Sequence, residues 1–73
     1  FSHMREKKIG RLLGKKVQRL RKSEGYTQEE LAEHVGISRT HMGHIEQGRK
    51  FPSLEIIDKL ARKIKVKVSE LFS

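Results

Sequence analysis

The chain contains no cysteine and no tryptophan, and it has a single proline. Without cysteine it can form neither disulfides nor thiolate zinc sites, and it has no cysteine nucleophile. Long apolar runs are also missing, because none exceeds pairs such as Leu12-Leu13. About 20 consecutive apolar residues are needed to cross a bilayer. We therefore expect a cytoplasmic protein with no membrane partner.

Acidic residues are scarce beside basic ones: nine against 17, for a net charge of +8. Residues 1–26 carry nine bases and two acids, whereas residues 27–35 carry three acids and no base. Such asymmetry indicates a surface for a polyanion. Two alternatives stay open. One is a solvated basic face that keeps the protein soluble, and the other is adsorption to a membrane, which the lack of an aromatic residue in the basic first helix disfavours.

A length of 73 residues supports one small domain. Residues 1–3 are expected to be the remnant of an expression tag before Met4. Residues 4–12 are either a basic N-terminal arm or an extension of the first helix, because Gly10 and Gly14 weaken helical structure there. Residues 13–73 then form the folded domain.

Apolar residues at helical spacing predict a first amphipathic helix, with Leu13, Val17 and Leu20 on its buried side. Thr27-Gln28-Glu29-Glu30 matches a capping box and predicts the start of a second helix, which ends at Gly36. Ser38 caps a third helix that points Met42 and Ile45 inward and ends at Gly48.

Ser53 is expected to cap a fourth helix whose buried positions are Leu54, Ile57, Ala61 and Ile64. The tail is ambiguous, since residues 64–68 alternate between apolar and basic as a strand does. A lone strand would have no partner within this chain. A tight turn followed by a short fifth helix that ends at Leu71-Phe72 is therefore preferred.

Two short helices joined by Gly36-Ile37-Ser38 describe a helix-turn-helix. The string TQEELAEHVGISRTHMGHIEQGRKFPSLEIIDKLA closely resembles the Cro and phage-repressor type of helix-turn-helix protein, the XRE family. Within that family, Arg39-Thr40 and Ile45-Glu46 are similar to the controller proteins of restriction-modification systems. The resemblance implies an all-α, compact five-helix bundle of the lambda-repressor type, with the third helix in the DNA major groove.

The sequence departs from the family pattern at two positions near the tail. Lys65 stands where glycine usually ends the fourth helix, and Lys67 stands where a small capping residue is usual. Both departures leave the start of the fifth helix open.

If Met42 and Ile45 face the core, the opposite side of the third helix is available to base edges. Its candidates for base reading are Arg39, Thr40, Gly43, His44 and Gln47. Arg39 suits guanine, because it can donate two hydrogen bonds to O6 and N7. The candidates for phosphate contacts are Gln28, Ser38, Arg49 and Lys50.

Gly43 is unusual within a helix, where glycine costs about 1 kcal/mol relative to alanine. Two explanations stay open: tolerated drift at an exposed site, or close approach of the helix backbone to DNA.

The family resemblance also implies a partly buried ion pair between Arg21 and Glu46. His41 and His44 lie three residues apart on the third helix, but two imidazoles without cysteine or further ligands make a poor metal site. We expect no metal, no cofactor, no small-molecule ligand and no catalytic activity.

The function expected from these features is that of a sequence-specific transcriptional regulator that binds double-stranded DNA as a homodimer on a near-palindromic operator. The candidate subunit contact consists of Ile56, Leu60, Val68 and Phe72, although these residues could instead complete the monomer's core. Two other functions stay open. One is a protein-interaction module such as an antitoxin or adaptor, and the other is nucleic-acid binding through charge alone.

Overall fold

The computed structural model describes residues 2–73, so Phe1, the first residue of the expected tag remnant, lies outside the described residues. Four α-helices and one 3-10 helix follow in the order α1 (Ser2–Ser23), α2 (Gln28–Val35), α3 (Arg39–Glu46), α4 (Leu54–Lys63) and η1 (Val68–Phe72). The all-helical prediction is confirmed, and the fifth helix is a 3-10 helix. Residues 64–68 form no strand, so that alternative is wrong.

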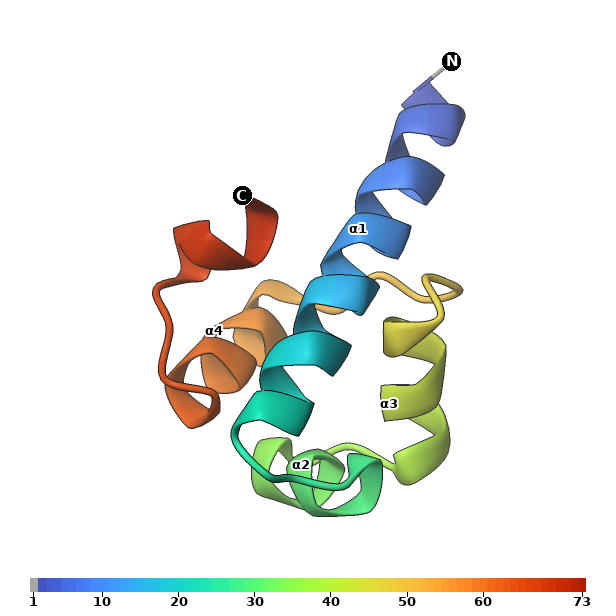
Figure 1. The fold of residues 1–73 in the computed structure, drawn as a ribbon. Coiled ribbons are helices and arrows are strands. Elements are labelled where there is room, and N and C mark those ends of the chain that lie inside the picture. Colours follow the sequence, from blue (N-terminus) through green and yellow to red (C-terminus); the bar gives the residue numbers. More distant parts are fainter. Residues whose placement is uncertain (1) are drawn as a thin grey trace.

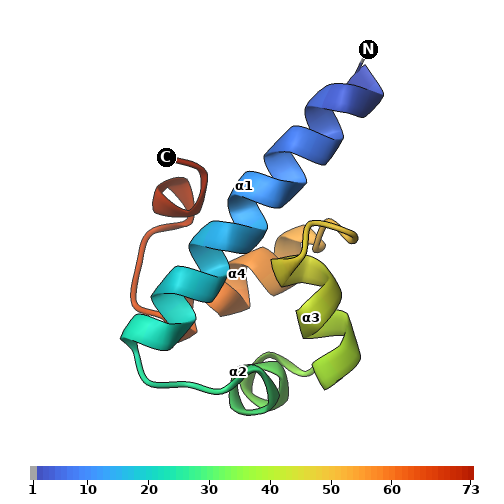
Figure 2. The ribbon, with the colours of Figure 1, turned by 45° about the vertical axis from the view of Figure 1, so that its right-hand side comes forward.

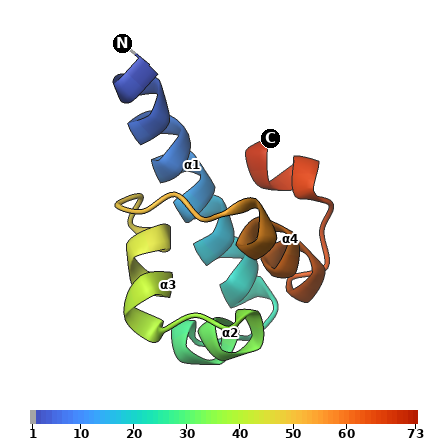
Figure 3. The ribbon, with the colours of Figure 1, turned by 180° about the vertical axis from the view of Figure 1, so that it is seen from behind.

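α1 is much longer than the other helices, and its N-terminal end projects beyond the rest of the molecule (Figure 1). α2 packs against α3 and α4, while α1 packs against α3 and η1. Turning the molecule shows α2 nearly end-on below the C-terminal end of α1 (Figure 2). From behind, α4 and η1 lie on the side away from α3 (Figure 3). Within residues 2–73, no helix is both long and apolar enough to cross a membrane.

Side-chain caps begin three of the helices. The Thr27 hydroxyl accepts a hydrogen bond from the Glu30 amide at 3.0 Å, and the Thr27 amide donates to Glu30 Oε1 at 2.9 Å. Ser38 Oγ accepts from the third amide of α3 at 3.0 Å, and Ser53 Oγ accepts from the third amide of α4 at 3.2 Å. Each cap satisfies an amide that has no partner within its helix. The three predicted caps are therefore confirmed.

The core is apolar and draws on every element. Its fully buried members are Leu13, Val17, Leu31, Ala32, Val35, Met42, Ile45, Ile57, Leu60, Ala61, Ile64 and Leu71. Two predictions about α4 are wrong. Leu54 is 83% exposed because it is the first residue of the helix, so the buried face begins one turn later at Ile57. Leu60 is 0% exposed, so it belongs to the core and not to a subunit contact.

α1 is a continuous helix through residues 4–12, despite its glycines. Gly14 lies where α1 crosses the C-terminal end of α3. A Cβ atom on Gly14 would lie 2.5 Å from the Glu46 carbonyl oxygen and would also collide with the Ile45 carbonyl oxygen. Only glycine lets the two backbones approach this closely. Gly14 therefore lowers the helix propensity of α1 but allows α1 to pack closely against α3.

The turn after α4 contains Lys65 in the left-handed conformation, with φ of 62°. The Val66 amide donates to the Ala61 carbonyl at 2.9 Å, which closes the helix in the manner usual for a glycine turn. Lys67 precedes η1, and its amide donates to Glu70 Oε1 at 3.2 Å. The turn therefore has the left-handed geometry that is usual for glycine, although lysine occupies the position.

Candidate nucleic-acid interface

The turn between α2 and α3 fixes the orientation of α3. Gly36 ends α2 with φ of 77°, and the Ile37 amide donates to the Ala32 carbonyl at 3.0 Å. The Ile37 side chain packs against the core. Since Met42 on the other side of this turn is fully buried, α3 is anchored at its start and along its inner face.

The outer face of α3 is available to a partner. Arg39, Thr40 and Gln47 are exposed, and Gly43 and His44 are half-buried. Successive positions of an α-helix are about 100° apart, so these five residues lie within one side of the helix, opposite Ile45. The structure therefore brings the five base-reading candidates together on one face.

Space around Gly43 is open. A Cβ atom there would meet only the Gln28 side-chain oxygen, at 3.9 Å, which is ordinary contact. No packing within the described residues therefore requires glycine at this position. The contrast with Gly14, where a Cβ atom would collide with backbone, leaves docking to a partner or drift as the explanation of Gly43.

A buried ion pair joins α1 to α3. Arg21 Nε donates to Glu46 Oε2 at 2.7 Å, and the second guanidinium nitrogen donates to Glu46 Oε1 at 3.1 Å. The third nitrogen donates to the Tyr26 carbonyl at 2.7 Å. The predicted pair of Arg21 and Glu46 is confirmed, and its bidentate geometry is that of a strong ion pair.

Gln28 also belongs to this network, which sequence reasoning missed. Its Nε2 donates to Glu46 Oε1 at 3.0 Å, so Glu46 accepts from both α1 and α2. Nothing in the spacing of residues 28 and 46 indicated this contact, because it depends on how α2 and α3 cross. Gln28 is thus held at the start of α2, beside the outer face of α3.

The four phosphate candidates differ in whether their side chains already make hydrogen bonds within the fold. Ser38 accepts from the His41 amide as a cap, and Gln28 is bonded to Glu46. Arg49 and Lys50 are exposed in the loop that follows α3. Their amides donate to the His44 carbonyl, at 2.9 and 3.3 Å, which holds this loop against the end of the helix.

Of the three acidic residues of α2, one caps the helix start and two are exposed to solvent. Glu29 and Glu33 are exposed. The pKa of Glu30 is lowered from 4.5, chiefly because its carboxylate accepts from the Thr27 amide, with further contributions from the Thr27 side chain and the charge of His34. Glu30 is therefore part of the helix start.

Sequence reasoning also missed two basic residues near the end of α3. Lys7 and Arg11, on α1, line a groove together with Gln47 and Arg49. The signals were the excess of bases in residues 1–26 and the basic character of residues 4–12, but neither indicated that these side chains lie beside Gln47 and Arg49.

Comparison with known proteins matches residues 12–71 to a family described as a helix-turn-helix domain. YazB of Bacillus subtilis (strain 168), described as an uncharacterised helix-turn-helix transcriptional regulator, is 40% identical over 58 residues, which cover 80% of this chain and 84% of YazB. Among solved structures, the restriction-modification controller protein C.AhdI from Aeromonas hydrophila superposes with a TM-score of 0.80 at 35% identity, covering 85% of this chain and 94% of C.AhdI. The biofilm regulator SinR, solved in complex with DNA, superposes with a TM-score of 0.77 at 29% identity, covering 84% of this chain and 98% of SinR.

Proposed function

Because the chain belongs to the XRE family of helix-turn-helix transcriptional regulators, which bind DNA and are not enzymes, we propose that it recognises a near-palindromic operator as a homodimer. In this proposal α3 enters the major groove, and its outer residues read the bases. The observation that carries the proposal is the outer face of α3, where residues with base-reading chemistry lie together while the inner face is buried. SinR, a structural neighbour at 29% identity, was solved with DNA, which supports the same mode of binding here.

Each side chain has a proposed role. Arg39 donates two hydrogen bonds to guanine, Thr40 contacts a thymine methyl, and Gln47 bonds to adenine. His44 donates or accepts according to its tautomer. Arg49 and Lys50 contact phosphates, with Gln28 and Ser38 at the helix starts that face the same backbone.

A homodimer is proposed because one reading helix covers only a few base pairs. Two copies related by a two-fold axis place their reading helices about 34 Å apart, one turn of DNA, and so double the recognised sequence. The proposed subunit contact is built on Val68 and Phe72, which are 40% and 48% exposed on η1, with the half-buried Ile56 at its edge. Phe72 borders a hollow beside Ile9 and Leu12 on α1, so these exposed apolar residues extend the same surface.

Selection from a pool of random duplexes tests this function. We expect enrichment of one sequence with two inverted half-sites about 10 base pairs apart, and the preference should persist as salt rises. A charge-only binder would enrich no sequence. A protein-interaction module would bind little DNA at low or high salt. Either of those results would contradict the proposal.

A further inference from the structure

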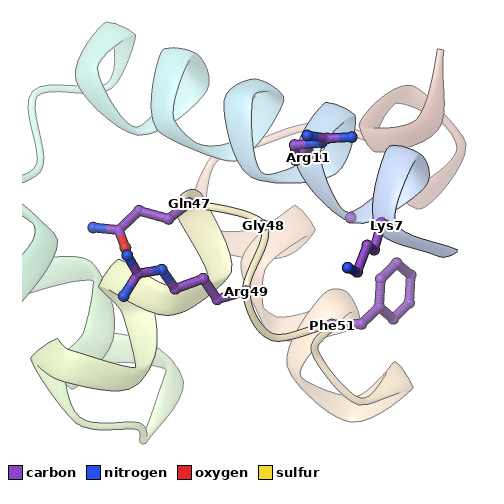
Figure 4. Close-up of a pocket in the computed structure, with 7 residues that line it drawn as sticks. Lys7, Arg11, Gln47, Gly48, Arg49 and Phe51 are labelled. Carbon is purple, nitrogen blue, oxygen red and sulfur yellow. The ribbon is translucent and has the colours of Figure 1, made fainter. Parts of the chain in front are cut away.

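A groove of about 430 Å³ lies between the N-terminal part of α1 and the loop that joins α3 to α4 (Figure 4). The residues that line it are Lys7, Gly10, Arg11, Gln47, Gly48, Arg49 and Phe51. Three of these described residues are basic and none is acidic. We call this feature the α1-loop groove. Its charge fits an anionic partner.

Two glycines let the walls of the α1-loop groove approach each other closely. A Cβ atom on Gly48 would lie 2.6 Å from Arg11 Cγ, so the stem of Arg11 lies directly on the glycine. On the other side, a Cβ on Gly10 would contact the Phe51 ring at 3.9 Å. The glycines therefore let α1 touch the loop, and the charged ends of Lys7 and Arg11 stay at the surface of α1. Within residues 7–73, neither of them forms an ion pair.

The α1-loop groove continues the proposed reading face. Gln47, the last base-reading candidate, also lines the groove, and Arg49 follows two residues later. In Figure 4, Gln47 and Arg49 extend together on one side of the loop, while Lys7 and Phe51 lie together on the other. The positive charges thus follow a track and do not converge on one point. Such a track suits the successive phosphates of a polymer better than a single small anion.

Lys7 and Arg11 precede the residues that match the helix-turn-helix family, which begin at residue 12. Arg11 lies against Gly48 in the loop after α3, and Lys7 lies one helical turn earlier on α1. Contacts made by this basic wall would add to those of the reading helix.

We propose that the α1-loop groove binds the phosphate backbone of duplex DNA that flanks the half-site read by α3, an inference that rests on the proposed function. In this proposal Lys7 and Arg11 bind phosphates outside the operator. Arg49 binds the phosphates between these and the bases that the end of α3 reads. These contacts carry no sequence information, so they raise the affinity for every duplex that is long enough to reach the α1-loop groove, whatever the sequence of its flanks.

The test compares the full chain with a double variant, Lys7→Gln with Arg11→Gln. Glutamine keeps the Cγ atom that lies on Gly48 and has similar helix propensity. The control variant, Lys8→Gln with Lys22→Gln, removes the same charge from exposed positions of α1 that line neither this groove nor the hollow beside Phe72. Each protein is titrated with the duplex enriched from the random pool, carrying either long flanks or none, at several salt concentrations.

On the duplex with long flanks, we expect the groove variant to bind roughly tenfold more weakly, and its plot of log affinity against log salt to lose about two units of slope, close to one for each phosphate contact. The control variant should lose much less of both. On the duplex without flanks, the groove variant should bind as the unaltered chain does. The enriched sequence itself should stay the same.

Equal losses in the two variants would overturn the inference, because charge anywhere on α1 would then suffice. A groove-variant loss that persists without flanks would also overturn it. Both results leave the proposed function intact, whereas failure of the selection to enrich any sequence would reject the proposed function itself.

Discussion

Single residues in this protein separate into those that hold the fold and those that face a partner, and the glycines illustrate the difference. Gly14 lies against backbone oxygens of α3, whereas Gly43 faces open space on the proposed reading surface. Both lie within helices, where propensity alone predicts the same cost for each. Only the surroundings distinguish them, so opposite effects are expected from the same substitution.

Gly14→Ala should destabilise the protein by about 2–3 kcal/mol, since its methyl group forces α1 and α3 apart. Gly43→Ala should stabilise it by about 0.5–1 kcal/mol, because alanine is the better helix former and its methyl group meets no obstacle. Urea unfolding of the two variants beside the unaltered chain measures both values. Equal effects of the two substitutions would contradict this account.

The same Gly43→Ala variant should bind the enriched duplex about tenfold more weakly, the cost of one lost close contact. Titration of that duplex measures the change. Binding of undiminished strength would instead identify Gly43 as drift at an exposed position.

Glu46 is the residue on which three helices depend, because it accepts hydrogen bonds from Arg21 of α1 and Gln28 of α2. Glu46→Ala leaves the Arg21 guanidinium buried without its counter-charge and should cost about 3 kcal/mol or more. Glu33→Ala, at an exposed site, should change stability by less than about 0.5 kcal/mol. Melting curves of the two variants make the comparison, and similar midpoints would refute it.

At the scale of elements, helix starts depend on a few local contacts, and α2 supplies one that varies with pH. The hydrogen bonds from Thr27 lower the pKa of Glu30 below 4.5 in the folded chain. The unfolded chain therefore binds more protons in this range, and stability rises with pH. The contribution of Glu30 is fully present above about pH 4.5 and is lost as the pH falls through the lower, folded pKa.

Glu30→Gln should therefore be less stable than the unaltered chain at pH 6, and the difference should shrink towards pH 3, where the carboxyl group is protonated in both states. Unfolding of both proteins across this range measures the effect. Glu33→Gln is the control for the loss of one charge from α2. A difference between Glu30→Gln and the unaltered chain that stays constant with pH would contradict the role of the Thr27 contacts.

Local signals predicted the elements well, and tertiary contacts account for what they missed. The cap at Thr27 is signalled by Glu30 three positions later, and those at Ser38 and Ser53 by a serine before an apolar periodic segment, so the sequence sufficed. Leu54 and Leu60 were misplaced because helical periodicity reports a face and does not report where neighbouring helices end. Periodicity likewise could not reveal that Gln28 bonds to Glu46.

At the scale of the whole molecule, its charge and its exposed apolar surface suggest two kinds of partner. Bases predominate on α1 and in the loop after α3, while apolar side chains remain exposed on η1 and on α1. The sequence predicted the first feature through composition. It also named Val68 and Phe72 as candidates for a contact surface, but it could not predict that Ile9 and Leu12 stay exposed beside them, because that depends on how the tail folds back over the bundle.

The proposed dimer predicts that Phe72→Asp converts the protein to a monomer, since a carboxylate would be buried in the subunit contact. Sedimentation should then give the mass of one chain, and binding to the two half-sites should lose cooperativity. Leu54→Asp is the matched control, because Leu54 is an equally apolar residue that is 83% exposed at the start of α4. Dissociation by the Leu54 variant and not by the Phe72 variant would assign the contact to α4.

The outer face of α3 has a consequence for how this protein could be retargeted. Among the described residues, the side chains of Arg39, Thr40, His44 and Gln47 make no hydrogen bond within the fold. The angle of α3 is instead set by the backbone contact at Gly14, by the buried inner face and by the Glu46 network. The residues proposed to read bases are therefore separate from those that hold α3 in place. Exchange of the outer side chains of α3 should accordingly change the preferred operator and leave the fold unaltered.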